Sequence, residues 1–429
     1  MRKPDQHAIG VKLIFLIVLT TIFGSNAEEA VRWWKGNLHT HSLWSDGNDY
    51  PEVIALWYKD HGYNFLSLTD HNTLSRGKRW SHVEKNKGGP KAFARYLKAF
   101  GANWVETRAG GQGMEVRLKP LTEFRSLLES PGEFIFIEGE EVTDRYRTLP
   151  IHLNASNLEN RLDPQGGASV SEVIQNNLDA LNKHREETQR DMILHLNHPN
   201  FGYAVTAEDL IKVKGQRFIE IYNGHPSVHN EGDDTHASVE KIWDIVLSWK
   251  LGLQNEALVY GLAVDDGHDY FDFSPAKSNP GRGWIQVESS HLTPERIIQG
   301  LENGRFYASS GVEIVNLRTE PGGLGFSIQA ETGIQYTTQF IGTKRGFNTH
   351  NAPVKNSAGE KLRVTHRYSD EVGQVLLETN DLNPFYKFGG DEIYVRARIH
   401  SSKKKNNPYI AGEVEKAWIQ PVRGPAVRP

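Results

Sequence analysis

Short hydrophobic runs alternate with segments of helical hydrophobic spacing through most of the chain. Apolar residues at every second position, or in continuous short runs, predict strands, whereas apolar residues three and four apart predict helices. Strands are predicted at residues 32–39, 65–69, 133–137, 150–155, 192–196, 218–222, 259–264 and 284–287, and helices at residues 51–61, 120–129, 169–187, 206–213, 236–250 and 294–303. Strands alternating with helices favour an α/β fold with a parallel sheet, and this many units over about 280 residues favour a barrel.

The pattern changes after residue 312. Helical spacing gives way to alternating polar and apolar positions, as in residues 392–399, with Gly, Asn and Pro between the segments. This predicts a small all-β, sandwich-like C-terminal domain over residues 313–429, after a first domain over residues 28–312. Residues 75–90 and 101–115 are rich in glycine and basic residues, and we interpret them as loops.

The N-terminus has the pattern of an export signal. Positive charges at Arg2, Lys3 and Lys12 come before or within the start of an apolar run over residues 11–24, and the small residues Ser25-Asn26-Ala27 follow it. This predicts a signal peptide over residues 1–27 and an exported protein, periplasmic or secreted, without membrane contact after cleavage. The run is shorter than the roughly 20 residues that span a bilayer, although an uncleaved N-terminal anchor remains an alternative.

Composition narrows the possible chemistry. The net charge of −4 and the pI near 6.5 give no basic footprint, which argues against nucleic acid and anionic membrane as partners. The chain has no cysteine, which excludes disulfides, thiolate metal ligands and a cysteine nucleophile. A bound metal must therefore have nitrogen and oxygen ligands, which suit Mn, Zn or Fe. The chain has 18 histidines to supply them.

Histidines and acids gather where predicted strands end. In His39-Thr40-His41 the two imidazoles are two residues apart, so a strand presents both on one side, and Asp46 follows. Comparable groups end later strands: Asp70-His71, Asn197-His198 and Asp266-Gly267-His268. Any one of them could be a surface histidine or a helix cap. Because the C-terminal strand ends of a parallel barrel open on one face, the set together predicts one metal site.

In combination these residues resemble the polymerase and histidinol phosphatase (PHP) family of metal-dependent phosphoesterases. The matching residues are His39-Thr40-His41, Asp46, Thr69-Asp70-His71, Gly139-Glu140-Glu141-Val142, His152, Asn197-His198-Pro199 and Asp265-Asp266-Gly267-His268. The resemblance covers roughly residues 33–312. It implies a distorted seven-stranded β/α barrel that holds two or three divalent metal ions.

The resemblance also implies roles for individual residues. It assigns to the first metal His39, His41, Glu141 and Asp266, to the second the bridging Glu141 with His152 and His198, and to the third Asp46, His71 and His268. Asp266, Glu141 and His268 are the implied catalytic residues. From the residues alone, Glu138 and Glu140 compete with Glu141. Asp265 competes with Asp266, but the two-residue spacing Asp266-x-His268 favours Asp266. We interpret His195 as a packing or outer residue, and Asp70 as an outer residue that orients a ligand histidine.

One branch of the family is especially similar. The stretch from Gly283-Trp284 to Gly304-Arg305-Phe306-Tyr307-Ala308-Ser309-Ser310-Gly311, together with the appended β domain, resembles exported carbaryl-hydrolase-like enzymes. This resemblance widens the range of expected substrates, because a carbamate, a carboxylic ester or an amide could be cleaved at the same metals.

The expected reaction is hydrolysis of a small phosphomonoester or phosphodiester by a metal-activated hydroxide. The substrate is expected to be anionic, and candidate contacts on the predicted catalytic face are Arg145, Arg147, Asn223 and His225. Two alternatives stay open: carbamate, ester or amide hydrolysis at the same metals, and a secreted binding module whose metals are structural. In either case the β domain is a candidate for contact with glycan or cell wall. The Gly-x-Ser-x-Gly pattern is absent, which argues against a serine esterase.

Overall fold

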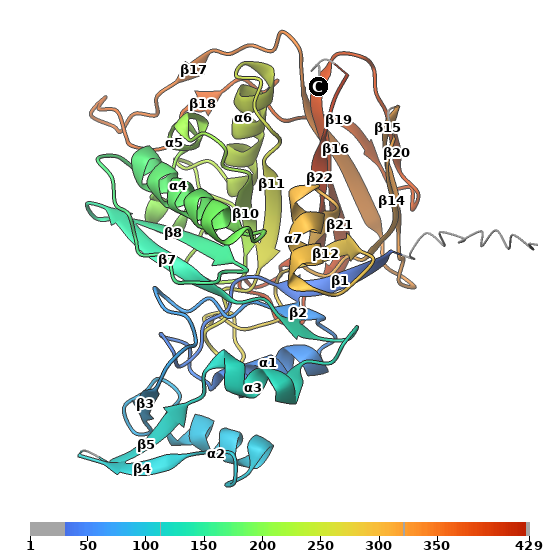
Figure 1. Cartoon of the computed structure of the whole chain (residues 1–429). Coiled ribbons are helices and arrows are strands. Elements are labelled where there is room, and N and C mark those ends of the chain that lie inside the picture. The colour runs from blue at the N-terminus through green and yellow to red at the C-terminus, as the bar shows by residue number, and fades with distance from the viewer. Residues whose placement is uncertain (1–30, 112, 321, 426–429) are drawn as a thin grey trace, which may run out of the picture. The chain divides into compact units, whose positions relative to one another are not determined.

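The computed structural model describes residues 31–111, 113–320 and 322–425 (Figure 1). The predicted signal peptide therefore lies outside the described residues. Within these ranges no helix has both the length and the apolar character needed to cross a membrane.

The largest sheet has nine strands in the order β19-β16-β21-β22-β13-β12-β1-β2-β6. Strand β1 (Arg32–Asn37) pairs antiparallel with β12 (Trp284–Ser289) and parallel with β2 (Phe65–Leu66). Strand β2 pairs parallel with β6 (Ile135–Phe136), and β12 pairs antiparallel with β13 (Phe306–Ser309). The predicted strands at residues 32–39, 65–69, 133–137 and 284–287 thus lie side by side in one sheet.

A second sheet has five strands in the order β11-β10-β9-β8-β7. Its bounds are β7 (Gly139–Tyr146), β8 (Leu149–Ser156), β9 (Ile193–Leu196), β10 (Phe218–Asn223) and β11 (Tyr260–Val264). The last three are parallel to one another, whereas β7, β8 and β9 are antiparallel. Helices α4 (Val170–Thr188), α5 (Ala207–Lys212) and α6 (Val239–Gly252) flank this sheet, with the 3-10 turn η1 (Phe201–Tyr203) after β9 (Figure 1).

Two isolated bridges join the sheets just beyond the ends of β1 and β2. Thr40 pairs with Gly267, and His71 pairs with Glu141, both in parallel orientation. The mixed α/β class is therefore confirmed, and strands of the two sheets meet at the positions of predicted ligands. A closed seven-stranded barrel stays a prediction.

The interpretation of residues 75–90 and 101–115 as loops is partly wrong. Strands β3 (Arg79–His82), β5 (Gly113–Leu118) and β4 (Thr107–Gly110) form an antiparallel sheet, and α2 (Gly89–Phe100) lies between β3 and β4 in the chain. These elements bury Tyr96 and Val116 in a cluster that includes Trp44 from the loop after β1. Strands this short, joined by glycines, show too little alternation to be recognised in the sequence. Helices α1 (Pro51–Asp60) and α3 (Leu121–Leu128) pack on each other beside this unit.

The described residues of the C-terminal part form strands joined by turns, while a separate sandwich-like domain stays a prediction. Strands β14 (Ile314–Glu320), β15 (Gly323–Ile328) and β20 (Phe385–Lys387) form one sheet, and β17 (Asn351–Ala352) pairs with β18 (Arg367–Tyr368). The remaining strands, β16 (Tyr336–Lys344), β19 (Gln374–Thr379), β21 (Glu392–Lys404) and β22 (Val414–Arg423), belong to the nine-stranded sheet. Since β22 pairs with β13, and α7 (Pro294–Glu302) precedes β13, this sheet continues across the predicted boundary at residue 312.

A buried carboxyl group in α1 should make the stability of the protein depend on pH. Glu52 is fully buried and accepts hydrogen bonds from the Tyr96 hydroxyl (2.5 Å) and Trp104 Nε1 (3.2 Å). Burial raises the pKa of Glu52 from near 4.5 to about 7. The folded protein therefore keeps this proton at pH values where the unfolded chain has lost it. The stability that the group contributes is fully present below pH 4.5 and is lost as the pH rises to about 7.

We expect Glu52→Gln to reduce the loss of unfolding free energy between pH 5 and pH 8 by about 2 kcal/mol, since each pKa unit corresponds to about 1.4 kcal/mol. Urea unfolding of both proteins at the two pH values measures this difference. An equal loss in the two proteins would show that Glu52 titrates normally.

Candidate metal centre

The structure brings all nine predicted metal ligands together. His39, His41 and Asp46 follow β1, His71 follows β2, Glu141 and His152 belong to β7 and β8, His198 follows β9, and Asp266 and His268 follow β11. Five overlapping groups of the described residues have possible ligand atoms within 4.8 Å of one another, and they include all nine. Segments as distant in the chain as residues 39 and 268 thus share one site.

Glu141 lies at the centre of the cluster. One carboxylate oxygen, Oε1, is 3.0 Å from His152 Nδ1 and 3.5 Å from both His39 Nε2 and His198 Nε2. The other, Oε2, is 2.7 Å from His71 Nδ1 and 3.3 Å from His41 Nε2. Although buried, Oε2 accepts no hydrogen bond from any described residue. An oxygen surrounded by ring nitrogens without hydrogen bonds fits a bridging metal ligand.

The competing glutamates point elsewhere. Glu138 forms an ion pair with Arg76, and Glu140 accepts a hydrogen bond from the backbone nitrogen of Leu162. Of the three acids considered in this segment, only Glu141 faces the histidines.

Asp266 and not Asp265 faces the cluster. Asp266 Oδ1 is 3.3 Å from Nε2 of both His39 and His41. Asp265 instead accepts hydrogen bonds from the backbone nitrogens of residues 281–283 and from the side chains of Asn37 and Tyr58. Asp266 has a left-handed backbone (φ 50°), which an aspartate tolerates better than most residues, and such strain is frequent at functional sites.

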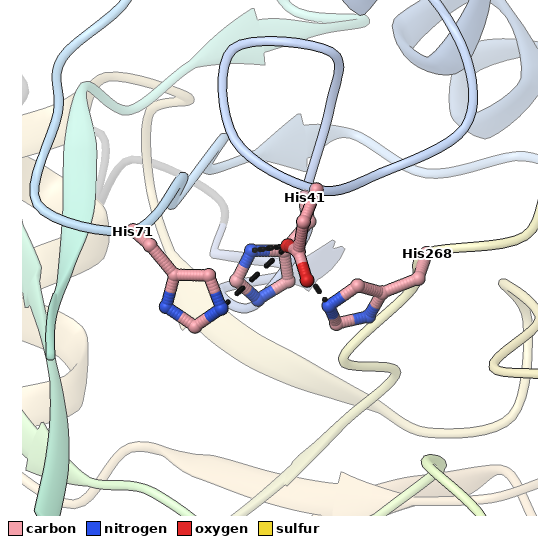
Figure 2. Close-up of side chains that lie close together, drawn as sticks. His41, His71 and His268 are labelled. Carbon is pink, nitrogen blue, oxygen red and sulfur yellow. Dashed lines mark ion pairs between the residues drawn. The ribbon is translucent and has the colours of Figure 1, made fainter. Parts of the chain in front are cut away.

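A third group forms around Asp46. Its Oδ1 lies 3.2 Å from His268 Nε2, 3.5 Å from His41 Nδ1 and 3.6 Å from His71 Nε2 (Figure 2). One carboxylate and three imidazoles are a nitrogen and oxygen ligand set typical of Zn, Mn or Fe.

Hydrogen bonds fix which ring nitrogen of three histidines faces the cluster. His39 Nδ1 donates to Glu220 Oε1 (2.7 Å), and His268 Nδ1 donates to the backbone carbonyl of Asp266 (2.9 Å). His71 Nδ1 donates to Thr143 Oγ1 (2.6 Å), whose own hydroxyl donates to a backbone carbonyl. When these rings are neutral, Nε2 is the unprotonated nitrogen. It faces Glu141 and Asp266 in His39, and it faces Asp46 in His71 and His268, although His71 Nδ1 also lies 2.7 Å from Glu141 Oε2. A metal-binding histidine usually donates its other ring N–H to a carboxylate, carbonyl or similar acceptor in this way.

Charge in the cluster also suits a cation. Burial alone would raise the pKa of Glu141, but His152, His71 and His39 hold it well below its usual value. The pKa of Asp266 is likewise held low, against the effect of burial, by His39 and His41. Burial and the neighbouring His268 lower the pKa of His41 to about 3. The same carboxylates raise the pKa values of His39 and His71 against the effect of burial, so a bound cation would replace protons that these rings otherwise hold.

Glu220 is a site residue that the sequence interpretation missed. It is buried in β10 and contacts His39, His195 Nε2 (3.2 Å) and the backbone nitrogen of His198 (2.8 Å). Its signal in the sequence is an acid in the middle of the hydrophobic run at residues 218–222. His195, as an outer residue, contacts this glutamate. Among the described residues, Asp70 does not orient a ligand histidine by a hydrogen bond, as the sequence interpretation expected. It accepts hydrogen bonds from Ser42 and Ser45, and so supports the loop that carries Asp46.

Glu220 supplies a testable prediction. Because it fixes the His39 tautomer, we expect Glu220→Gln to weaken metal binding by about ten- to a hundredfold, as is usual for outer partners of metal ligands. Titration of the metal-free protein with Mn²⁺ measures the change. The exposed Glu231→Gln is the control, with unchanged affinity expected. Equal metal affinity in Glu220→Gln and the parent would show that the contact is only structural.

Of the four residues predicted to contact substrate, one lines the cavity over the metal ligands, one bonds to the buried acids, and two are exposed outside the cavity. His225 lines a cavity of about 150 Å³ over the predicted ligands, together with the apolar Phe201 and Val228. Asn223 donates its side-chain N–H groups to Glu220 (2.9 Å) and Asp266 (3.1 Å), so it supports the acids. Arg145 and Arg147 are exposed and are not among the residues that line this cavity. Their contact with substrate stays a prediction.

No family model matches the sequence, and a comparison with curated proteins gives no match. Among solved structures, the chain is similar to a two-domain protein from Bacteroides vulgatus containing a predicted PHP-like metal-dependent phosphoesterase, with 15% identity and a TM-score of 0.37 over 91% of this chain and 95% of that one. It is also similar to a protein from Bifidobacterium adolescentis named as a metal-dependent phosphoesterase (10% identity, TM-score 0.29, 62% and 94% of the chains). A third is an amidohydrolase from Chromobacterium violaceum with bound sulfate and no metal (12% identity, TM-score 0.24, 57% and 93%). At these TM-scores the functional argument rests on the geometry of the site.

Proposed function

We propose that this chain is a PHP-type, metal-dependent hydrolase that cleaves phosphoester bonds of a small anionic substrate. One observation carries the proposal: nine histidine and carboxylate side chains from separate strand ends meet in one cluster, with Nε2 of three rings turned toward the acids. Outer hydrogen bonds that fix ring orientation are what a metal site needs, and a chance gathering of surface histidines does not have them.

The residues allow two or three divalent ions. His39, His41, Glu141 and Asp266 would hold the first, the same Glu141 with His152 and His198 the second, and Asp46, His71 and His268 the third. Bound divalent ions lower the pKa of water and polarise the oxygen of the scissile group. Glu141 and Asp266 connect the three ligand groups, because the carboxylate of each lies close to histidines of more than one group. Elemental analysis after mild purification should count two or three ions of Mn, Zn or Fe per chain.

The surroundings of the cluster complete the site. Phe201 and Val228 line the cavity with apolar surface, and His225 lies close to His268, with ring centroids 5.5 Å apart. Polar groups held in place beside apolar surface act more strongly on developing charge than they would in water.

A hydrolysis screen tests the reaction. The purified protein is supplied with Mn, Zn or Fe and assayed on phosphomonoesters, phosphodiesters, carbamates and carboxylic esters. We expect phosphoester hydrolysis that a chelator removes and added metal restores. Carbamate or ester hydrolysis without phosphoesterase activity would instead support the alternative hydrolase, and binding of metal without any turnover would support a binding module.

Export is part of the proposal. The small residues before Glu28 favour cleavage after Ala27, so the exported protein should begin at Glu28. N-terminal sequencing of the exported protein checks this, and residues 1–27 retained in a membrane fraction would indicate an anchor.

Contact of the C-terminal strands with glycan or cell wall also remains a proposal, for which polysaccharide pull-down is the direct assay.

A further inference from the structure

A second cavity adjoins the one over the predicted ligands. Its volume is about 380 Å³, compared with about 150 Å³ for the metal-facing cavity. Asp46 and His268 line both, so the two spaces meet at the third group of predicted ligands. A substrate whose reacting group lies at the cluster therefore has room for its remaining atoms in the second cavity.

Two lysines from different loops line this second cavity. Lys87 belongs to the loop between β3 and α2, and its Nζ is 3.1 Å from Asp46 Oδ2. Lys277 belongs to the loop after β11, and its Nζ is 3.5 Å from Asp269 Oδ1. Both lysine side chains are exposed, so a molecule in the cavity can reach their ammonium groups.

The carboxylates that line the cavity have partners of their own. Asp269 accepts hydrogen bonds from Asn48 Nδ2 (3.1 Å) and from the backbone nitrogen of Ser278 (3.3 Å), in addition to its contact with Lys277. Asp272 forms an ion pair with Lys91 (2.7 Å). Apart from Lys277, the two hydrogen bonds to Asp269 and the ion pair of Asp272 with Lys91 thus offset part of this negative charge.

How far the positive charge of Lys87 is compensated depends on the other contacts of Asp46. Asp46 turns Oδ1 toward three histidines and Oδ2 toward Lys87. A cation held at Oδ1 would take up part of the charge of Asp46, which would then compensate Lys87 less. The ammonium group of Lys87 would then be a positive charge in the second cavity, beside Asp46, available to an anion.

We propose that the second cavity binds an anionic group of the substrate remote from the cleaved bond, and that Lys87 and Lys277 select it. The substrate class is a phosphoester whose other end carries its own negative charge, such as a carboxylate. This inference rests on the proposed function, because it places the cleaved bond at the predicted ligands.

Binding of non-hydrolysable phosphonates tests it. Three compounds share a phosphonate head and differ in the tail: phosphonopropionate has a carboxylate, butylphosphonate is neutral, and aminopropylphosphonate has an ammonium group. Their dissociation constants are measured by calorimetry on the full protein with Mn²⁺. An added ion pair is worth up to about 1 kcal/mol, so we expect phosphonopropionate to bind roughly fivefold tighter than butylphosphonate.

Lysine variants test whether Lys87 and Lys277 cause the preference for the carboxylate tail. In Lys87→Met the ratio of the two dissociation constants should fall to near one, and in Lys277→Met it should fall in part. A ratio within one variant cancels any general change in affinity for the phosphonate head. Lys85→Met is the matched control, because Lys85 lies in the same loop and is exposed but does not line the cavity.

Each other outcome is decisive. Tighter binding of aminopropylphosphonate would show that the acids dominate, and equal affinity for all three tails would show that the cavity does not read charge; either result overturns the inference but not the proposed function. A preference that survives in both lysine variants also overturns it. If Mn²⁺ binds but no phosphonate does, the proposed phosphoester chemistry fails and the inference fails with it.

Discussion

Replacing Glu141 with glutamine is expected to remove metal binding and hydrolysis together. The carboxylate faces ring nitrogens of five histidines at 2.7 to 3.5 Å. Glutamine keeps the shape but loses the negative charge, and it presents N–H groups where a cation would bind. Removing an outer partner of a ligand costs about ten- to a hundredfold in affinity, so loss of a shared ligand should cost more than about a hundredfold.

Glu138→Gln is the matched control. Glu138 lies three residues earlier in the same segment and pairs with the exposed Arg76 outside the cluster, so its replacement should leave metal content and turnover unchanged. Elemental analysis, Mn²⁺ titration and the rate on the best substrate of the screen are compared for the parent and both variants. A Glu141→Gln protein with full metal content and turnover would exclude the metal mechanism.

Replacing Arg396 with methionine is expected to destabilise the protein by about 3–5 kcal/mol, the usual cost of breaking a buried ion pair. Arg396 lies in β21 with 1% of its side chain exposed. It donates through Nε (2.8 Å) and an amino group (2.7 Å) to the carboxylate of Asp244 in α6, and it lies 3.2 Å from Glu240. The variant leaves the buried Asp244 without this partner, whereas the partly exposed Glu240 keeps its contacts with Arg398 and Trp418.

Two further variants test that explanation. Arg398→Met removes a neighbouring and more exposed arginine that also pairs with Glu240, and it should cost less than about 1 kcal/mol. The double variant Arg396→Met/Asp244→Asn removes both charges and should recover a large part of the loss. Free energies from urea unfolding of the four proteins are compared. A single-variant cost below 1 kcal/mol would show that Asp244 is adequately solvated in the native state.

The ion pair between Arg396 and Asp244 also affects the expected stability of a chain shortened after residue 312. A protein of residues 28–312 would lack Arg396 and the strands β21 and β22, the second of which pairs with β13. It would leave Asp244 without its arginine and expose a sheet edge, a common cause of aggregation. We therefore expect the shortened chain to be much less stable than the full one, although any folded fraction should still bind metal.

The sequence by itself determined most of the site's chemistry. The two-residue spacings His39-x-His41 and Asp266-x-His268 suggested paired side chains, and their positions after hydrophobic runs locate them at strand ends. The same local periods predicted most strands and helices before residue 312 and the change to strands after it. The hydrophobic pattern did not predict the short strands before and after α2, because each is too short to show a recognisable alternation.

Only the tertiary structure decided which groups touch across long distances in the chain. Glu220 bonds to His39 across 181 residues, and Lys87 reaches Asp46 from a unit that the hydrophobic pattern did not reveal. The spacing to His268 had favoured Asp266 over Asp265, and the structure shows what Asp265 does instead: it accepts hydrogen bonds from the backbone of residues 281–283, whereas Asp266 faces the histidines. The physical reason is that local periods specify which side of a strand a residue takes, whereas its partners depend on sheet order and register. Those are properties of the whole packed chain.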